Sequence, residues 1–411
     1  PKNNFSKFCK ILNNLIIHKK INLINTEMQD ELINKNNTIK IYPWNSTENP
    51  VKVNCIRYNQ DSSLLIVATS KGYKIFSSST FKELGENTDV IKNFGDIHVA
   101  ELYFSSKLVF LLPSKFNKDY TNNEIIIFDD YFQKQVGSLK SKKEKIQSFS
   151  VSKNLISIIT MKEIIVVELK SLQIIEIIED IAFNDKILSF NPFDYLAYTK
   201  SADRKTLYIE TFKSENGKIT SRKIQKIDST FDFIQILHFS PDGNQIAVLS
   251  IFGNKLHIYK TQTGQLKNCI FLGPKIQTLD RIFFSEKKPN YLLFIRNDKI
   301  FNIYKLGKAK DKEQLQKCIC NIDNDNDLVN RLNELDLKNA GLSKPRSMSK
   351  SKSVKEPHVY SDYSGRLLFA DFDRNKHKDL IFIDQEGKLI KYQFNKKKNG
   401  KIEPISMVQW I

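Results

Sequence analysis

Residues 232–273 read DFIQILHFSPDGNQIAVLSIFGNKLHIYKTQTGQLKNCIFLG, and this stretch decides the fold class. Apolar residues alternate through residues 234–239, and a buried run of strand length follows at 246–249. The turn Ser240-Pro241-Asp242-Gly243 separates these two strands, because proline fixes φ and glycine accepts a positive φ. A third strand is expected at 256–259, and a further turn leads to a fourth. The stretch therefore predicts a four-stranded unit that must stack on similar units to bury both of its faces.

The same unit recurs along the chain at intervals of 41 to 49 residues. Its marker is the aromatic residue that closes the first strand of each unit. These aromatics are Tyr58, Phe104, Phe149, Phe190, Phe239 and Phe284. A seventh unit at residues 366–394 follows after an insertion. Four strands repeated every ~40–45 residues are typical of propeller blades. We therefore predict an all-β, seven-bladed β-propeller of WD40-like architecture, although the Trp-Asp dipeptide is absent.

The repeat also divides the chain into regions. Residues 1–50 are expected to form a partly helical N-terminal extension, and residues 51–306 form blades one to six. Residues 307–357 interrupt the period and are expected to form a flexible insertion. Residues 358–411 then supply blade seven and close the ring.

Two terminal segments are candidates for the strand that completes the last blade, namely residues 38–44 and residues 405–411. Before them, residues 1–26 hold five lysines, no acidic residue and apolar residues at helical spacing. This basic amphipathic segment is consistent with a helix on the propeller side, a membrane-surface helix or an organelle transit peptide. The sequence leaves these alternatives open.

Composition narrows the functional class. The chain has 64 Lys and Arg against 46 Asp and Glu, a net charge of +18, which favours anionic partners or a lysine-rich solvated surface. Five scattered cysteines favour a reducing compartment, and no apolar run of membrane-spanning length occurs. A calcium-loop spacing begins at Asp323, but its turn position holds Leu328 instead of glycine. No catalytic set stands out, so we expect a non-enzymatic protein without a metal or cofactor.

The first two predicted blades contain short sequence motifs that are specific enough to suggest a family. Residues 58–63 read YNQDSS, residues 70–76 read SKGYKIF, and residues 100–109 read AELYFSSKLV. These motifs closely resemble the opening blades of the PROPPIN family. Members of that family are phosphoinositide-binding β-propellers of autophagy. The resemblance implies a scaffold in autophagy or endolysosomal traffic, cytoplasmic and peripheral on those membranes. It also implies phosphatidylinositol 3-phosphate as the ligand.

The lipid site of that family is where this chain departs from the pattern. The family carries Phe-Arg-Arg-Gly between blades five and six, and residues 270–273 here read Ile-Phe-Leu-Gly. A guanidinium offers a planar fork of donors to a phosphate, whereas Phe271 and Leu272 offer none. The resemblance leaves Ser250, His257, Gly273 and Lys275 as the lipid-binding candidates. We therefore expect phosphatidylinositol 3-phosphate binding to be weakened or lost.

The same substitution suggests a protein interface. An exposed Phe271 and Leu272 would gain nothing in water, so we expect at least one to be covered by the insertion or by another subunit. Apolar residues at helical spacing in the insertion are further interface candidates, namely Leu328, Leu332 and Leu335. We expect protein partners, no nucleic acid, and a monomeric propeller within a complex. The alternative is a lipid-independent structural subunit of a large assembly, with an organellar location.

Overall fold

The computed structural model describes the blades and several of their connections. The described residues are 51–114, 123–141, 144–183, 188–215, 218–228, 233–250, 255–272, 279–285, 291–296, 301–306, 367–372, 379–384, 387–395 and 401–409. The N-terminal extension and the insertion at residues 307–357 lie outside these ranges. Their predicted boundaries and helices therefore stay predictions.

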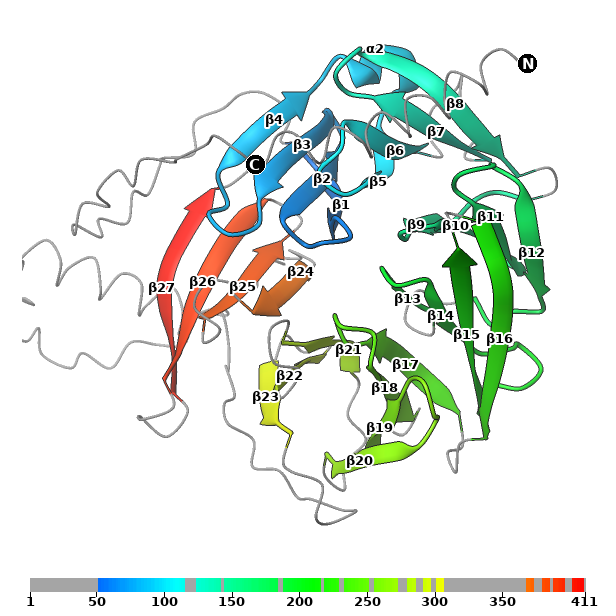
Figure 1. Cartoon of the computed structure of the whole chain (residues 1–411). Coiled ribbons are helices and arrows are strands. Elements are labelled where there is room, and N and C mark those ends of the chain that lie inside the picture. The colour runs from blue at the N-terminus through cyan, green and yellow to red at the C-terminus, as the bar shows by residue number, and fades with distance from the viewer. Residues whose placement is uncertain are drawn as a thin grey trace, which may run out of the picture.

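Seven antiparallel sheets stand around a central axis as the blades of a propeller (Figure 1). In six of them, four strands follow one another in chain order from the centre to the rim. Among the described residues the sheet of blade six has three strands. The predicted fold class, an all-β seven-bladed propeller, is confirmed.

Each blade takes its strands from one continuous stretch of chain. Blades one to three contain β1 (Val53–Tyr58), β2 (Leu64–Thr69), β3 (Gly72–Ser77), β4 (Glu83–Asn87), β5 (Ile97–Leu102), β6 (Leu108–Pro113), β7 (Glu124–Asp129), β8 (Lys134–Lys140), β9 (Ser148–Val151), β10 (Leu155–Ile159), β11 (Glu163–Glu168) and β12 (Ile174–Glu179). Blades four and five contain β13 (Ser189–Asn191), β14 (Tyr195–Tyr198), β15 (Thr206–Glu215), β16 (Lys218–Asp228), β17 (Ile234–Phe239), β18 (Gln245–Ser250), β19 (Lys255–Lys260) and β20 (Leu266–Phe271). Blades six and seven contain β21 (Leu279–Phe284), β22 (Tyr291–Arg296), β23 (Phe301–Lys305), β24 (Leu367–Phe372), β25 (Asp379–Asp384), β26 (Lys388–Asn395) and β27 (Lys401–Gln409). A short helix, α2 (Val90–Phe94), joins the first two blades, and the Val90 amide donates to Asn87 Oδ1 at its start (3.2 Å).

The aromatic marker of the sequence repeat falls on the innermost strands in all but one of the six units. Tyr58, Phe239 and Phe284 end their strands, and Phe149 and Phe190 lie within β9 and β13. The exception, Phe104, comes two residues after β5 and has a φ of 50°. The spacing thus located the blades correctly, although the position of the marker relative to the end of its strand varies from blade to blade.

The ring closes by packing between the first and last blades. β27 pairs with β26, which confirms the C-terminal segment as part of blade seven, whereas residues 38–44 lie outside the described residues. Ile381 and Ile383 of blade seven share one apolar cluster with Val67 and Phe76 of blade one. Within the described residues, apolar contact rather than an exchanged strand therefore joins the two ends of the ring.

Apolar clusters fill the other spaces between blades. Alternate residues of one strand pack against two different neighbouring blades, because successive side chains point to opposite faces of a sheet. In β18, Ile246 and Val248 pack toward blade four, whereas Ala247 and Leu249 pack toward blade six. This alternation decides which blade each candidate site residue of blade five faces.

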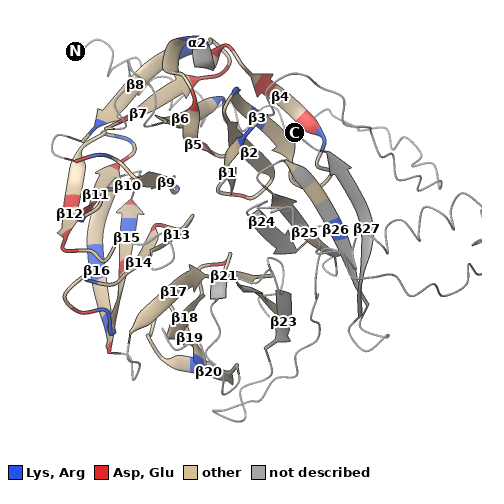
Figure 2. Cartoon of the chain, turned by 180° about the vertical axis from the view of Figure 1, so that it is seen from behind, with Lys and Arg blue, Asp and Glu red and all other residues tan. Residues whose placement is uncertain are grey.

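Polar contacts between blades add orientation to this packing. Arg57 of β1 pairs with Glu101 of β5 and donates to Ser148 Oγ of β9 (2.8 Å), which joins blades one, two and three. Charged side chains also lie on the outer strands, where Lys and Arg are found on β16 and β20 and acidic residues on β4 and β12 (Figure 2).

The turn of blade five is fixed by its neighbour. Asn191 Nδ2 of blade four donates to the Ser240 carbonyl (3.1 Å), and the Gly243 amide closes the turn onto the same oxygen (2.8 Å). Gly243 has a φ of 68°, and a Cβ there would lie 3.0 Å from Asn191 Oδ1. The Ser-Pro-Asp-Gly turn expected from the sequence is therefore both strained for other residues and held against blade four.

Candidate functional site

The candidate lipid site lies at one end of the outer strands of blade five. β18 ends there at Ser250, β19 begins at Lys255, and β20 ends at Phe271. Lys255 and Phe271 are directly paired across the β19–β20 ladder. The three strands thus bring Ser250 and Phe271 to one end of the blade, with His257 close to it on β19.

Ser250 and His257 are enclosed at this end. Ser250 is 4% exposed and His257 is 7% exposed. His257 lies opposite Val248, a member of the cluster toward blade four, and Ser250 is two residues further along the same strand. Both side chains therefore face blade four, and neither lies open on the rim for a ligand.

Burial also sets the charge of His257. Removal from water, together with the smaller effect of the positive charge of Lys255, lowers the pKa of the imidazole to about 4. His257 Nδ1 lies 3.3 Å from Tyr259 Oη within the same interior. His257 is therefore neutral at pH 7 and supplies no positive charge for a phosphate group.

Leu272 faces the opposite side of the blade. It is 6% exposed and packs with Ile270 of β20 and with Phe284 and Leu306 of blade six. Leu272 is thus covered by the propeller's own core, whereas the sequence led us to expect cover by the insertion or by another subunit. Its role as a partner contact stays a prediction.

Several predicted residues lie outside the described part of the chain. These are Gly273, Lys275, Leu328, Leu332 and Leu335, together with the side chain of Phe271. Their roles in lipid or partner binding stay predictions. The same holds for the lipid-binding role of Ser250 and His257.

Sequence reasoning missed one charged residue at this end of the blade. Lys255 is exposed, begins β19, and lies close enough to His257 to lower its pKa. Its position was visible as the polar residue just before the alternating strand 256–259. Lys255 is one exposed cation here, and a lysine binds a phosphate as a point charge without the bidentate geometry of arginine. Arg204 and Lys205 of blade four are also exposed near this end, because the Ile234 amide donates to the Arg204 carbonyl (2.9 Å) and Ile234 pairs with Ser250.

The described residues offer little other chemistry at this end. No group of three or more His, Cys, Asp or Glu side chains within them is placed to hold a metal ion. In the same part of the chain, no helix has the length and apolar character needed to cross a bilayer. The arrangement is that of a packed blade end with exposed cations beside it, Lys255 on blade five and Arg204 and Lys205 on blade four.

The chain was compared with family models, with curated protein sequences and with solved structures. No family model matches the chain. SVP1-like protein 2 of Schizosaccharomyces pombe is 23% identical over 234 residues, which is 53% of this chain and 58% of that protein. Autophagy-related protein 18 of Caenorhabditis elegans is 25% identical over 285 residues, 64% of this chain and 64% of that protein. The chain therefore spans less than two thirds of the length of these relatives.

Solved structures match a larger share of the chain. Kluyveromyces lactis Hsv2 superposes with a TM-score of 0.64 at 12% identity, covering 88% of this chain and 100% of that one. Atg21, solved in complex with the coiled coil of Atg16, gives a TM-score of 0.57 at 14% identity, covering 87% and 99%. At such identities the structural likeness establishes the propeller fold. The chain is therefore similar in sequence to SVP1-like and autophagy-related 18 proteins and shares its propeller fold with Hsv2 and Atg21.

Proposed function

We propose that this protein is a non-enzymatic β-propeller scaffold of autophagy or endolysosomal membrane traffic, with weakened or absent binding of phosphatidylinositol 3-phosphate. The sequence match to the SVP1-like and autophagy-related 18 proteins carries the first half of the proposal. Structural kinship to Atg21 in complex with a coiled coil supports a role in holding protein partners.

The second half rests on the electrostatics of blade five. The two arginines of the family's Phe-Arg-Arg-Gly motif, which bind phosphate groups, correspond to Phe271 and Leu272 in this sequence. Leu272 is packed in the core between two blades. His257 is neutral at pH 7, so the exposed cations at this end include Lys255 of blade five and Arg204 and Lys205 of blade four. Exposed charges of this kind attract a headgroup weakly and are screened by salt.

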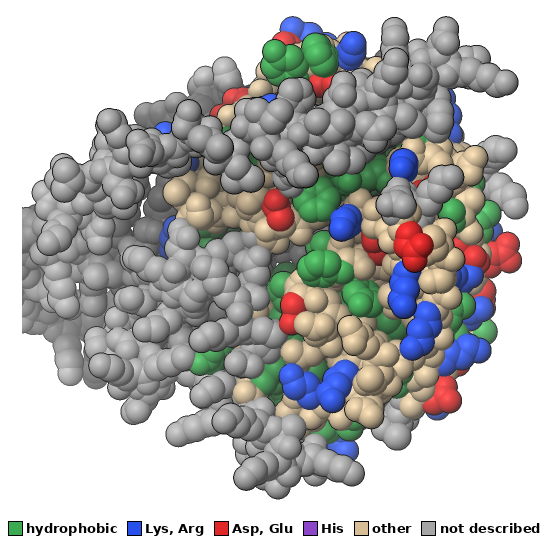
Figure 3. Space-filling view, viewed as in Figure 1, with side chains coloured by type: hydrophobic (Ala, Val, Ile, Leu, Met, Phe, Trp, Pro, Cys, Tyr) green, Lys and Arg blue, Asp and Glu red, His purple; other side chains and the backbone are tan. Residues whose placement is uncertain are grey.

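The rest of the surface gives generic rather than specific attraction. Figure 3 shows Lys and Arg side chains spread over the described part of one face, with acidic side chains among them. A net charge of +18 dispersed in this way favours contact with any anionic membrane at low salt. Such contact does not distinguish one phosphoinositide from another.

Vesicle flotation tests the lipid part of the proposal. The full-length protein is mixed with neutral vesicles, with vesicles holding phosphatidylinositol 3-phosphate, and with vesicles of equal charge made with phosphatidylserine. We expect similar flotation with both anionic vesicles, and loss of both when salt is raised. Salt-resistant binding to the phosphoinositide vesicles alone would overturn the proposed loss of the site.

Affinity purification of the native protein tests the scaffold part. We expect autophagy proteins to co-purify in amounts below one copy per propeller, as for a recruited scaffold. Recovery in a single large complex of fixed stoichiometry would instead support the alternative, a lipid-independent structural subunit. The burial of Leu272 and the neutrality of His257 favour neither partner set, so this measurement decides between the two.

A further inference from the structure

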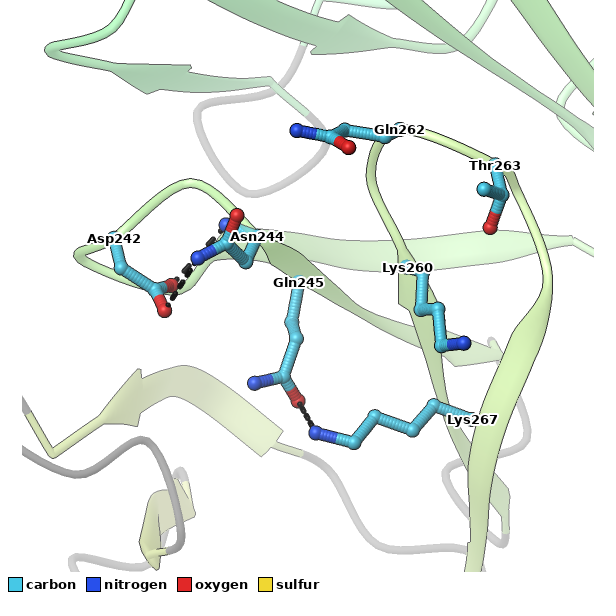
Figure 4. Close-up of a pocket in the computed structure, with 7 residues that line it drawn as sticks. All are labelled: Asp242, Asn244, Gln245, Lys260, Gln262, Thr263 and Lys267. Atoms are coloured by element: carbon cyan, nitrogen blue, oxygen red, sulfur yellow. Dashed lines mark hydrogen bonds between the residues drawn. The ribbon is translucent and has the colours of Figure 1, made fainter.

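The other end of blade five carries a polar hollow. It has a volume of about 340 Å³ and is lined by side chains from three neighbouring strands and their turns (Figure 4). Asn244 and Gln245 lie at the start of β18, Lys260 ends β19, and Lys267 is the second residue of β20. All of the lining residues are polar or charged.

The hollow is separate from the candidate lipid site. Gln245 and Ser250 are the first and last residues of β18, so five residue steps separate the two ends. At about 3.3 Å per residue this corresponds to ~16 Å along the strand. The hollow therefore shares no described residue with the position of the Phe-Arg-Arg-Gly motif.

A β-bulge places one of its lysines. In the ladder between β19 and β20, Ile258 pairs with Asn268 and Tyr259 pairs with Leu266, which leaves Lys267 as the extra residue. A bulge re-aims the side chain it carries. Lys267 Nζ reaches across to Gln245 Oε1 at 3.0 Å, and Gln245 itself is only 6% exposed (Figure 4).

The charge balance of the hollow is positive. Asp242, the one carboxylate among the described lining residues, accepts hydrogen bonds from Ser240 Oγ (2.5 Å) and from the amide and side chain of Asn244 (3.1 and 2.9 Å). Burial alone would raise the pKa of Asp242, but these hydrogen bonds outweigh burial and hold it below its usual value. Asp242 is therefore already satisfied within its turn. Lys260 has no ion-pair partner within the part of the chain that the structure describes.

We propose that this hollow binds an acidic segment of a partner protein, with carboxylate side chains meeting Lys260 and Lys267. Gln262 and Thr263 on the adjoining turn supply exposed donors and acceptors for the backbone of such a segment. Charge complementarity of this kind guides association and register at an interface. The assignment rests on the proposed scaffold function only in taking the occupant to be part of a protein.

The lining favours a peptide over the other anionic partners. Membrane surfaces are held by apolar and aromatic side chains beside the cations, and the described lining residues include neither. Single-stranded nucleic acid is bound on aromatic platforms, which the described lining residues likewise do not supply. Amide and hydroxyl groups around two lysines suit the carboxylates and backbone of an extended acidic chain.

Fluorescence anisotropy with the full-length protein tests the proposal. The probe is a fluorescein-labelled peptide of six glutamates flanked by glycines, titrated at fixed physiological salt. The double variant Lys260→Gln with Lys267→Gln should weaken binding by about five-fold or more, since two surface ion pairs are lost. The matched control is Lys213→Gln with Lys223→Gln, which removes two exposed lysines from β15 and β16 of blade four. It should weaken binding by less than about two-fold, and both variants must melt as the unaltered protein does.

Three results would overturn the proposal. Equal weakening by both double variants would mean that the peptide follows the net charge rather than the hollow. Loss of binding to phosphatidylserine vesicles in the Lys260/Lys267 variant, with peptide binding intact, would assign the hollow to a membrane. Peptide binding that emerges only after Asp323, Asp325 and Asp327 are changed to asparagine would make this chain's own acidic stretch the occupant. Because no outcome depends on phosphoinositides or autophagy partners, the scaffold function is tested separately.

Discussion

The imidazole of His257 gives the protein a measurable response to pH. Its pKa is about 4 in the folded protein and 6.5 when exposed, so the unfolded chain binds the proton first as pH falls. The stability that this residue contributes is complete above pH 6.5 and is lost progressively between pH 6.5 and pH 4. We expect His257→Gln to reduce the difference in unfolding free energy between pH 7 and pH 5 by about 2 kcal/mol.

Urea denaturation at the two pH values measures this difference. The control is His98→Gln, which alters an exposed histidine on β5 and should leave the difference within ~0.5 kcal/mol of the unaltered protein. An unchanged pH response in His257→Gln would show that the imidazole is hydrated in solution.

Leu272 gives a second prediction at the scale of one residue. An arginine here would restore the charge that the family motif carries, but it would bury that charge between blades five and six. Leu272→Arg should therefore lower the free energy of unfolding by at least about 3 kcal/mol. Leu272→Met, which nearly conserves volume, should cost less than ~1.5 kcal/mol. If Leu272→Arg folds with undiminished stability and gains affinity for phosphatidylinositol 3-phosphate vesicles, this position belongs to the rim.

At the scale of elements, six blades are four-stranded hairpin series within the described residues, and blade six has three strands there (Figure 1). In the sequence, residues 307–357 follow directly after this blade and interrupt the repeat. Replacing residues 307–357 with a short Gly/Ser linker should change the melting temperature by less than ~2 °C, because loop-closure entropy varies slowly with length. Differential scanning calorimetry of the purified variant makes the measurement. Failure of the variant to express in soluble form would make the insertion part of the folded core.

For the whole molecule, the contact between blades one and seven closes the seven sheets into a ring. Ile383 is fully buried in the cluster that joins them, together with Val67 and Phe76. Ile383→Ala should cost about 2–5 kcal/mol, since it leaves a cavity in that cluster. Hydrogen exchange should increase most in β1–β4 and β24–β27, on the two sides of the cavity.

The matched control for ring closure is Ile177→Ala. Ile177 lies on β12 and is 44% exposed, so its truncation should cost less than ~0.5 kcal/mol. A similar loss of stability in both variants would mean that the cluster between blades one and seven has no special role in closing the ring.

The sequence by itself determined the blades of this propeller. Strand positions such as 234–239 and 246–249 follow from local alternation, and the turn at Ser240–Gly243 follows from residues that prefer its dihedral angles. The period of the aromatic marker located six blades, and a further unit at residues 366–394 supplied the seventh, because a unit with two apolar faces must stack on another. These signals are local or periodic, so a single sequence contains them.

Only the tertiary structure decided where the candidate site residues point. The family motif aligned Leu272 with an exposed arginine, but its side chain is buried between two blades, while Ser250 and His257 face the other neighbour. Lys267 joins Gln245 because a bulge in β20 shifts the alternation by one residue. A one-residue shift moves a side chain to the other face of a sheet, and the sequence does not mark where such shifts occur. Burial, pKa and the polar hollow all depend on these faces, because each is made by residues from different strands and blades.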